Sequence, residues 1–155
     1  MKYRKQDQKL LAIWAADCAE RVLPFFEKAY QDDRPRKAIE ACRTWIRTGV
    51  FKMADIRKAS LDAHAAAKKA KDNTSAHFAA HAAGQVVATA HVPEHAFGPA
   101  YYALKAVAAN SGDVLKEYNW QLSHLPKNLR KGWTDWQAKR MPKNLRQILM
   151  QKQSI

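Results

Sequence analysis

The histidines of this sequence are the residues best suited to chemistry by type and spacing. His77 and His81 stand four residues apart, so on a helix their imidazoles share one face and could ligate a single metal ion. His64, His91 or His95 could complete the site from adjacent helices, and such ligands would suit zinc, nickel or copper. No carboxylate or cysteine accompanies the pair at ligand spacing. The sequence therefore favours rings that act as spacers between helices, with no bound metal or other cofactor.

A second histidine pattern has the form of a zinc protease motif. The segment His91-Val92-Pro93-Glu94-His95 matches the H-x-x-E-H signature of inverted zinc metalloproteases. That chemistry needs one unbroken helical turn, and Pro93 lies inside the turn, where it would break the helix. The sequence also has no serine nucleophile elbow and no phosphate-binding glycine loop. We therefore predict that the protein is not an enzyme.

Basic residues outnumber acidic ones along the whole chain. There are 27 lysines and arginines against 14 aspartates and glutamates, which gives a formal net charge of +13. Such a charge predicts attraction to polyanions or to an acidic protein surface. The excess is densest in residues 111–155, with nine basic and three acidic residues. The residues that we expect to bind a partner there are Lys127, Arg130, Lys131, Arg140, Lys143 and Arg146.

Three tryptophans, Trp120, Trp133 and Trp136, lie among these basic residues. Cations that bind phosphates and rings that stack on bases are the features of a nucleic-acid surface. Large aromatic side chains are usually buried, so the tryptophans could instead anchor the last helices on the core while the cations stay solvated. The second interpretation is favoured, and nucleic acid remains the alternative partner.

Two aspartates and two arginines meet at a predicted helix start, Asp32-Asp33-Arg34-Pro35-Arg36. An aspartate there can cap the free amides of the helix while an arginine pairs locally. The arginines could also bind a partner's carboxylate or phosphate through two parallel hydrogen bonds. Capping is favoured because it needs nothing outside the chain. Asp33, Arg34 and Arg36 stay candidates for partner binding.

Helices must position these side chains, because apolar residues recur at helical spacing and no segment alternates convincingly with a period of two. Pro24 should kink the first helix, and Pro35 and Gly49 should bound the second. The pair Gly98-Pro99 should interrupt or restart the fifth. The predicted helices cover about residues 11–25, 33–49, 54–70, 75–91 and 93–110, followed by two or three shorter ones with breaks before Pro126 and Pro142.

Alanine is concentrated in the middle of the chain, where residues 61–110 hold 18 alanines and five of the six histidines. Small side chains at this density let helices approach closely. The sequence predicts an all-α fold without β-sheet, a compact bundle of about seven or eight helices with alanine-rich central helices. We expect residues 1–155 to form a single domain, with residues 111–155 packed on it as a basic helical extension.

The cysteines and the N-terminal segment indicate a cellular compartment. Cys18 and Cys42 lie among apolar residues without C-x-x-C spacing, which indicates reduced thiols rather than a disulfide framework or a zinc finger. The apolar run Leu10–Ala16 after the basic start is too short for a signal peptide and ends at Asp17. No apolar run approaches the ~20 residues of a membrane span. We expect a cytoplasmic protein without a membrane contact.

Three phrases of the sequence are specific in combination. They are Trp14–Pro24, Asp33–Ala41 and Ala83–Val92, the last continuing into His95-Ala96 and Ala100–Ala106. Together they resemble the immunity-protein domain of bacterial polymorphic toxin systems, over about residues 10–110. The resemblance implies an all-helical bacterial protein of the cytoplasm that binds and neutralises a cognate toxin and has no catalytic activity of its own. No agreed set of functional residues comes with it.

The chain departs from the family pattern at Lys68-Lys69, where an arginine-glutamate pair is expected, and in its lysine-rich tail. An inhibitor of a nuclease usually imitates nucleic acid and is acidic, so a charge of +13 argues for an acidic toxin as the partner. The resulting hypothesis is a non-catalytic protein-binding module of the immunity type. Its alternative is a helical protein that binds nucleic acid through the basic, tryptophan-containing C-terminal surface. The sequence does not fix an oligomeric state.

Overall fold

The computed structural model describes residues 3–151, and over this range it contains helices, turns and loops but no strand. This confirms the predicted all-α class. Three short 3-10 turns connect longer elements, η1 (Val87–Ala90), η2 (Pro93–Ala96) and η3 (Lys127–Leu129). The α-helices are α1 (Lys5–Val22), α2 (Pro24–Glu27), α3 (Arg34–Thr48), α4 (Met53–Lys69), α5 (Thr74–Val86), α6 (Phe97–Ala109), α7 (Val114–Ser123), α8 (Arg130–Arg140) and α9 (Lys143–Gln151).

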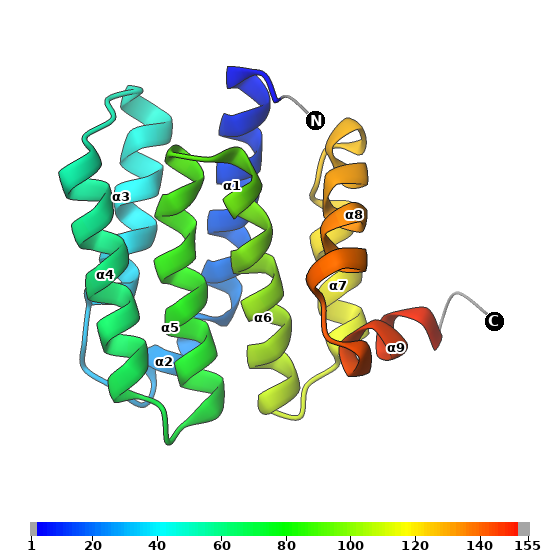
Figure 1. Cartoon of the computed structure of the whole chain (residues 1–155). Coiled ribbons are helices and arrows are strands. Elements are labelled where there is room, and N and C mark those ends of the chain that lie inside the picture. Colours follow the sequence, from blue (N-terminus) through cyan, green and yellow to red (C-terminus); the bar gives the residue numbers. More distant parts are fainter. Residues whose placement is uncertain (1–2, 152–155) are drawn as a thin grey trace.

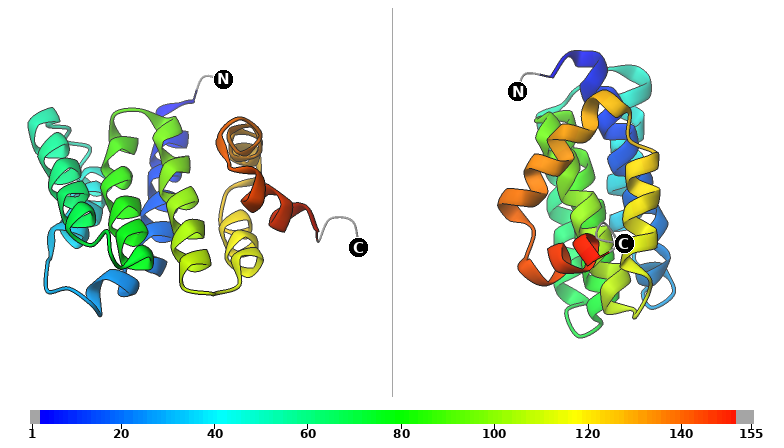
Figure 2. Two further views of the ribbon diagram at one scale, coloured as in Figure 1. Left: turned by 60° about the horizontal axis from the view of Figure 1, so that its bottom comes forward. Right: turned by 90° about the vertical axis from the view of Figure 1, so that its right-hand side faces the viewer.

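The helices stand side by side with α5 in the middle (Figure 1). Helices α4, α5 and α6 form one row, and α3 and α1 lie behind it (Figures 1 and 2). Helix α5 packs against α4 and α6 on its two sides and also contacts α1, α2 and α3. Helices α7 and α8 close the bundle beside α6, and α9 leads away from them at the C-terminal end.

Alanines make the central contacts, as the sequence predicts. On α5, the side chains of Ala76, Ala79, Ala80 and Ala83 are completely buried. Helix α4 presents Ala63, Ala66 and Ala67 to the same core, and α6 presents Ala100 and Ala103. Because these side chains end at Cβ, neighbouring helix backbones can come close together.

Local signals set the ends of α3 as predicted. Pro35 occupies the first turn, where its missing amide hydrogen costs no helical hydrogen bond. At the other end, Gly49 adopts a φ of 71°, and its amide donates to the carbonyl of Trp45 at 2.7 Å. Only glycine adopts this left-handed conformation without strain.

The predicted helix over residues 75–91 is shorter than expected. Helix α5 ends at Val86, and the chain continues as the 3-10 turn η1. The side-chain amide of Gln8 on α1 donates to the carbonyls of Thr89 and Ala90 at 2.9 and 3.1 Å. This long-range contact satisfies carbonyls that a longer helix would have used itself, and no local sequence signal shows it.

The fifth predicted helix opens at Pro93 and restarts at Gly98-Pro99, as expected. Residues Pro93–Ala96 form the 3-10 turn η2, and the α-helix α6 starts only at Phe97. Gly98 and Pro99 therefore lie in the first turn of α6. The first amides of a helix have no intrahelical acceptor, so Pro99 costs nothing there.

An aromatic cluster joins α8 to the body of the molecule. The ring of Trp133 on α8 stacks on Phe97 at a centroid distance of 5.7 Å and meets Trp14 of α1 edge-on, also at 5.7 Å. Trp133 is fully buried. A Cβ atom at Gly132 would lie 3.0 Å from the Phe97 ring and would also overlap Tyr3 Oη, so glycine permits this close approach. Trp133 thus anchors α8 on the core, as the favoured interpretation of the tryptophans predicts.

Both cysteines lie in the core as free thiols. Burial raises the pKa of Cys42 to about 12 and that of Cys18 in the same direction, so neither thiol ionises near neutral pH. Among the described residues, no helix combines the length and the hydrophobicity that crossing a bilayer requires.

Candidate functional site

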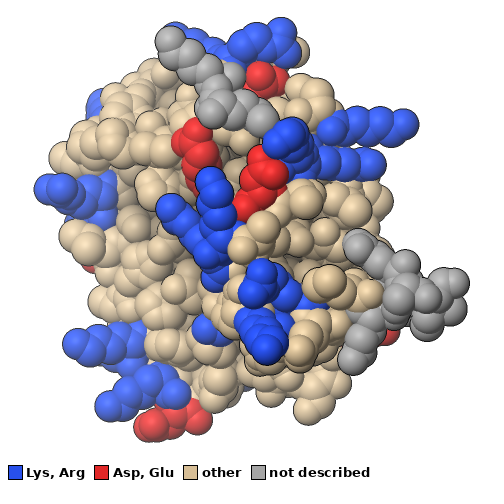
Figure 3. All heavy atoms as spheres, turned by 45° about the vertical axis from the view of Figure 1, so that its right-hand side comes forward, with Lys and Arg blue, Asp and Glu red and all other residues tan. Residues whose placement is uncertain are grey.

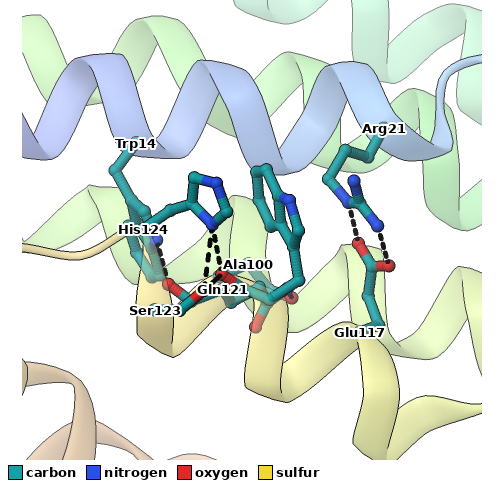
Figure 4. Close-up of polar contacts among 8 residues, drawn as sticks. Trp14, Arg21, Ala100, Glu117, Gln121, Ser123 and His124 are labelled. Atoms are coloured by element: carbon teal, nitrogen blue, oxygen red, sulfur yellow. Dashed lines mark hydrogen bonds and ion pairs between the residues drawn. The ribbon is translucent and has the colours of Figure 1, made fainter.

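Helix α7 is fixed to α1 by a polar seam, shown in Figure 4. The guanidinium of Arg21 donates to both carboxylate oxygens of Glu117, at 2.8 and 2.9 Å. Trp14 Nε1 donates to the carbonyl of Gln121 at 2.8 Å, and the Gln121 amide donates to the carbonyl of Ala100 on α6 at 2.9 Å. These bonds join three helices. They also show that Arg21 pairs across the fold rather than with Asp17, its neighbour at helical spacing.

Trp120 belongs to the same seam. The Arg21 guanidinium carbon lies 4.0 Å from the centroid of its ring, and the ring of His124 stacks on it at 4.1 Å. A cation placed over an indole face stabilises the contact. Two internal partners therefore occupy a ring that the nucleic-acid alternative would use for stacking on bases.

Ser123 and His124 lie 3.1 Å apart between Oγ and Nδ1, which resembles a nucleophile and its base. The same Nδ1 lies 2.8 Å from the carbonyl oxygen of Trp120. A carbonyl only accepts hydrogen bonds, so this Nδ1 carries the proton and offers no lone pair to the serine. The arrangement does not activate Ser123 for catalysis.

The arginines at the start of α3 are turned toward carboxylates of the same chain. Arg34 binds both carboxylate oxygens of Asp32, with a shortest distance of 2.7 Å, and its backbone amide donates to Asp32 Oδ1 at 3.1 Å. Arg36 binds Glu27 through two bonds of 2.7 Å. Asp33 is the N-cap by position but pairs with Lys37 instead of bonding an amide. Asp32 therefore supplies the side-chain bond to the helix start.

The structure brings His64, His77 and His81 together between α4 and α5. The Nδ1 atoms of His64 and His81 lie 2.6 Å apart, and His77 Nδ1 donates to the carbonyl of Ala67 at 2.7 Å. Burial, helped by the nearby His64, His77 and Lys105, lowers the pKa of His81 to about 4. The His64–His81 pair is therefore neutral near pH 7, with one ring donating and the other accepting.

His64 fills the space over Gly84, because a Cβ atom there would lie 2.8 Å from the imidazole. The side chains thus act as spacers between helices. Of the other two predicted metal candidates, His91 directly follows η1 and stacks on Phe51 at a centroid distance of 6.2 Å, and His95 lies on η2. Within residues 3–151, no three histidine, cysteine, aspartate or glutamate side chains are arranged to hold a metal ion.

The turn η3 and the last two helices carry what we call the basic C-terminal surface, formed by Lys127, Arg130, Lys131, Lys139, Arg140, Lys143 and Arg146. Residues 124–151 contain these seven basic residues and one acidic residue, Asp135. Lys131 pairs with Asp135 at 2.8 Å, and Arg130 Nε donates to the carbonyl of Leu125 at 2.9 Å. Within residues 3–151, no carboxylate lies at ion-pair distance from the other five.

Figure 3 brings this side of the molecule forward and shows lysine and arginine side chains gathered on it around a few acidic ones. Elsewhere in the fold several arginines form ion pairs, as Arg21, Arg34, Arg36 and Arg43 illustrate. Among the described residues, basic side chains without an ion pair also occur elsewhere, as at Lys52, Arg57 and Lys68, but in residues 124–151 a single carboxylate accompanies the seven basic residues. The structure thus places the predicted C-terminal residues on the consecutive elements η3, α8 and α9, whereas Asp33, Arg34 and Arg36 lie apart at the start of α3.

A groove that sequence reasoning missed adjoins this surface. Two neighbouring cavities of about 250 and 240 Å³ share Glu94, Trp136 and Arg140, and we call them together the α6–α8 groove. The first is also lined by Tyr3, Phe97, Gly132, Asp135 and Lys139, and the second by Gln85, His95, Gly98, Tyr101 and Tyr102. Its one sequence signal is Trp136, three residues after the buried Trp133, which places a second indole at the edge of the same helix contact.

Comparison with known proteins identifies the family. The model of the family described as Imm-5 like putative immunity protein matches residues 1–128. The match is longer than the predicted 10–110 and includes α7 with its seam to α1, but it ends before α8. No curated protein and no solved structure matches the chain. Because the matched region is more than half of the sequence, the protein belongs to the Imm-5 like putative immunity protein family.

Proposed function

We propose that this protein is a non-catalytic immunity protein that binds and neutralises a cognate bacterial toxin in the cytoplasm. Family membership carries the proposal. The geometry supports it, because the histidines act as spacers and the Ser123–His124 pair lacks a free base. A stoichiometric inhibitor needs a surface that fits its target rather than an activated group.

We place the toxin-binding surface on the basic C-terminal surface. Its five unpaired cations are available to a partner without breaking any ion pair of the protein. Arg34 and Arg36 would first have to leave Asp32 and Glu27, so they are the less favourable contact. The positive charge of this surface favours a toxin with an acidic surface. Such a pair would also associate faster through electrostatic steering.

The alternative is binding of nucleic acid by the same surface. Few aromatic rings are available to stack on bases, because Trp133 is fully buried and Trp120 is covered by Arg21 and His124. Of the three C-terminal tryptophans, Trp136 lines the two cavities but is itself partly buried against the core. One partly buried ring with scattered cations supports a protein partner better than a strand of bases.

The test is co-expression with the toxin domain encoded beside this gene in its source genome. We expect the protein to restore growth and an inactive toxin variant to bind it at 1:1 stoichiometry in calorimetry. The affinity should survive moderate salt. Duplex DNA serves as the comparison, because its binding would fall with a slope of about −0.9 in log K per phosphate contact. Growth arrest despite co-expression, with no binding to the toxin, would refute the proposal.

Matched charge reversals locate the surface. The variant with Lys127→Glu, Lys143→Glu and Arg146→Glu should weaken toxin binding at least tenfold. The control carries Lys52→Glu, Arg57→Glu and Lys68→Glu, three exposed residues at or on α4, at the opposite edge of the bundle (Figure 1). Both variants change the net charge equally, so equal losses would indicate a non-specific effect of charge and contradict the assigned surface.

A further inference from the structure

We propose that the α6–α8 groove is the anchor site for the toxin and receives an aromatic side chain that is flanked, on the α8 side, by a carboxylate. This inference rests on the proposed function and names the chemistry of the partner segment. The groove lies directly beside the unpaired cations of the basic C-terminal surface. Lys139 and Arg140 line the groove and also belong to that surface.

The lining of the groove is suited to an aromatic ring. Tyr3 and Phe97 line one cavity, Tyr101 and Tyr102 line the other, and Trp136 is common to both. Ring pairs in offset or edge-to-face geometry contribute about 0.5–1.5 kcal/mol beyond the burial of area. Tyrosine, tryptophan and arginine are also the residues that most often dominate binding energy at protein interfaces.

The groove is held open by rigid neighbours rather than by the partner. The Trp136 ring packs against Tyr101 at a centroid distance of 5.4 Å and against Trp133 at 5.5 Å. Trp133 is fully buried in the core, so it fixes the position of α8. A preformed pocket spares the ordering cost of forming it on binding, which favours tight association.

Charges around the groove discriminate between classes of partner. Lys139 and Arg140 lie on α8, whereas Glu94 on η2 and Asp135 contribute carboxylates. Both carboxylates are close enough to help burial raise the pKa of Tyr3. A phosphate chain would meet them as like charges. A polypeptide can place a carboxylate on Lys139 and Arg140 and a hydrogen-bond donor on Glu94, so the pattern favours a protein segment of mixed charge.

The experiment measures binding of the inactive toxin domain to groove variants of the full chain by calorimetry. Trp136→Leu should weaken binding about 30-fold, the effect of a hot-spot side chain, while Trp136→Phe should retain most of the affinity. Arg140→Gln should weaken toxin binding about tenfold. Phe51→Leu is the matched control, because Phe51 is an exposed aromatic residue in the loop before α4, on the other side of the bundle. Thermal unfolding of each variant checks its fold.

Glu94→Gln separates the two partner classes. A mixed-charge polypeptide should bind this variant no better than the wild type, whereas a polyphosphate should bind it more tightly, and that gain would overturn the inference. Wild-type affinity in both Trp136→Leu and Arg140→Gln would also overturn it while leaving the proposed function intact. If the wild-type protein itself fails to bind the toxin, the proposed function fails first and the anchor site with it.

Discussion

His64 and His81 face each other across the contact between α4 and α5, with their Nδ1 atoms 2.6 Å apart. At this distance only one proton can lie between the two nitrogens. A further proton would charge one ring in a half-buried site. Burial, helped by the nearby His64, His77 and Lys105, therefore lowers the pKa of His81 to about 4. The pair links the stability of the central helices to pH.

Stability should therefore decrease as the pH falls from about 6.5 to about 4. In the unfolded chain a histidine takes up its proton near 6.5, whereas His81 in the folded chain does so only near 4, so acid favours unfolding within this window. The contribution is fully present above pH 6.5 and is lost below about 4. Urea unfolding at pH 7.5, 5.5 and 4.5 measures it. The variant His81→Asn should have a flatter dependence, and equal dependence in both proteins would contradict the assignment to this pair.

Loss of Glu117 should destabilise the attachment of α7. Its carboxylate is mostly buried and receives two hydrogen bonds from Arg21. Glu117→Ala removes both and should lower the free energy of unfolding by about 2 kcal/mol. A double-mutant cycle with Arg21→Ala should give a coupling energy of about 1–2 kcal/mol. A coupling near zero would show that the pair is not formed in solution.

Gly132→Ala should destabilise the contact between α8 and the core. The added methyl group would overlap Tyr3 and approach the buried ring of Phe97, at a cost of about 1–3 kcal/mol. Gly98→Ala is the control, because the atom nearest to its methyl group would be Oε1 at the flexible end of Gln85, at 3.2 Å. Thermal unfolding should show a clear decrease for the first variant and little change for the second. The same decrease in both would indicate a general glycine effect instead of close packing.

Arg36→Gln should leave toxin binding unchanged. The side chain already pairs with Glu27 on a partly exposed surface, so its removal should lower stability by no more than about 1 kcal/mol. Calorimetry with the toxin domain and urea unfolding measure the two effects separately. A loss of toxin affinity of tenfold or more would instead place the contact surface at the start of α3. Asp33 and Arg34 would then bind the partner, the role for which the sequence makes them candidates.

The features that the sequence predicted well are those set by near neighbours in the chain. The ends of α3 follow from Pro35 and Gly49, and the crowded centre follows from the alanines of α4 and α5. Features set by distant residues were missed. Helix α5 stops at Val86 while Gln8, some 80 residues away, bonds the carbonyls of η1, and Arg21 finds Glu117 96 residues along the chain.

The candidate site follows the same rule. The basic residues of α8 and α9 could be selected from composition, because charge is a local property. The α6–α8 groove could not, since its walls are separated by more than 30 residues and meet only when Trp133 packs on Phe97. Glu94 was considered only within a zinc motif, whereas in the fold it stands opposite Trp136 and Arg140.

The two walls of the α6–α8 groove differ in their relation to the family. Glu94, Tyr101 and Tyr102 lie in the matched residues 1–128, whereas Trp136 and Arg140 lie beyond them on the helix that the buried Trp133 anchors. Changes in α8 would accordingly remodel half of the pocket and leave the alanine-packed helices untouched. Under the proposed function, a lineage could in this way exchange one toxin for another by altering the short stretch of sequence that encodes α8.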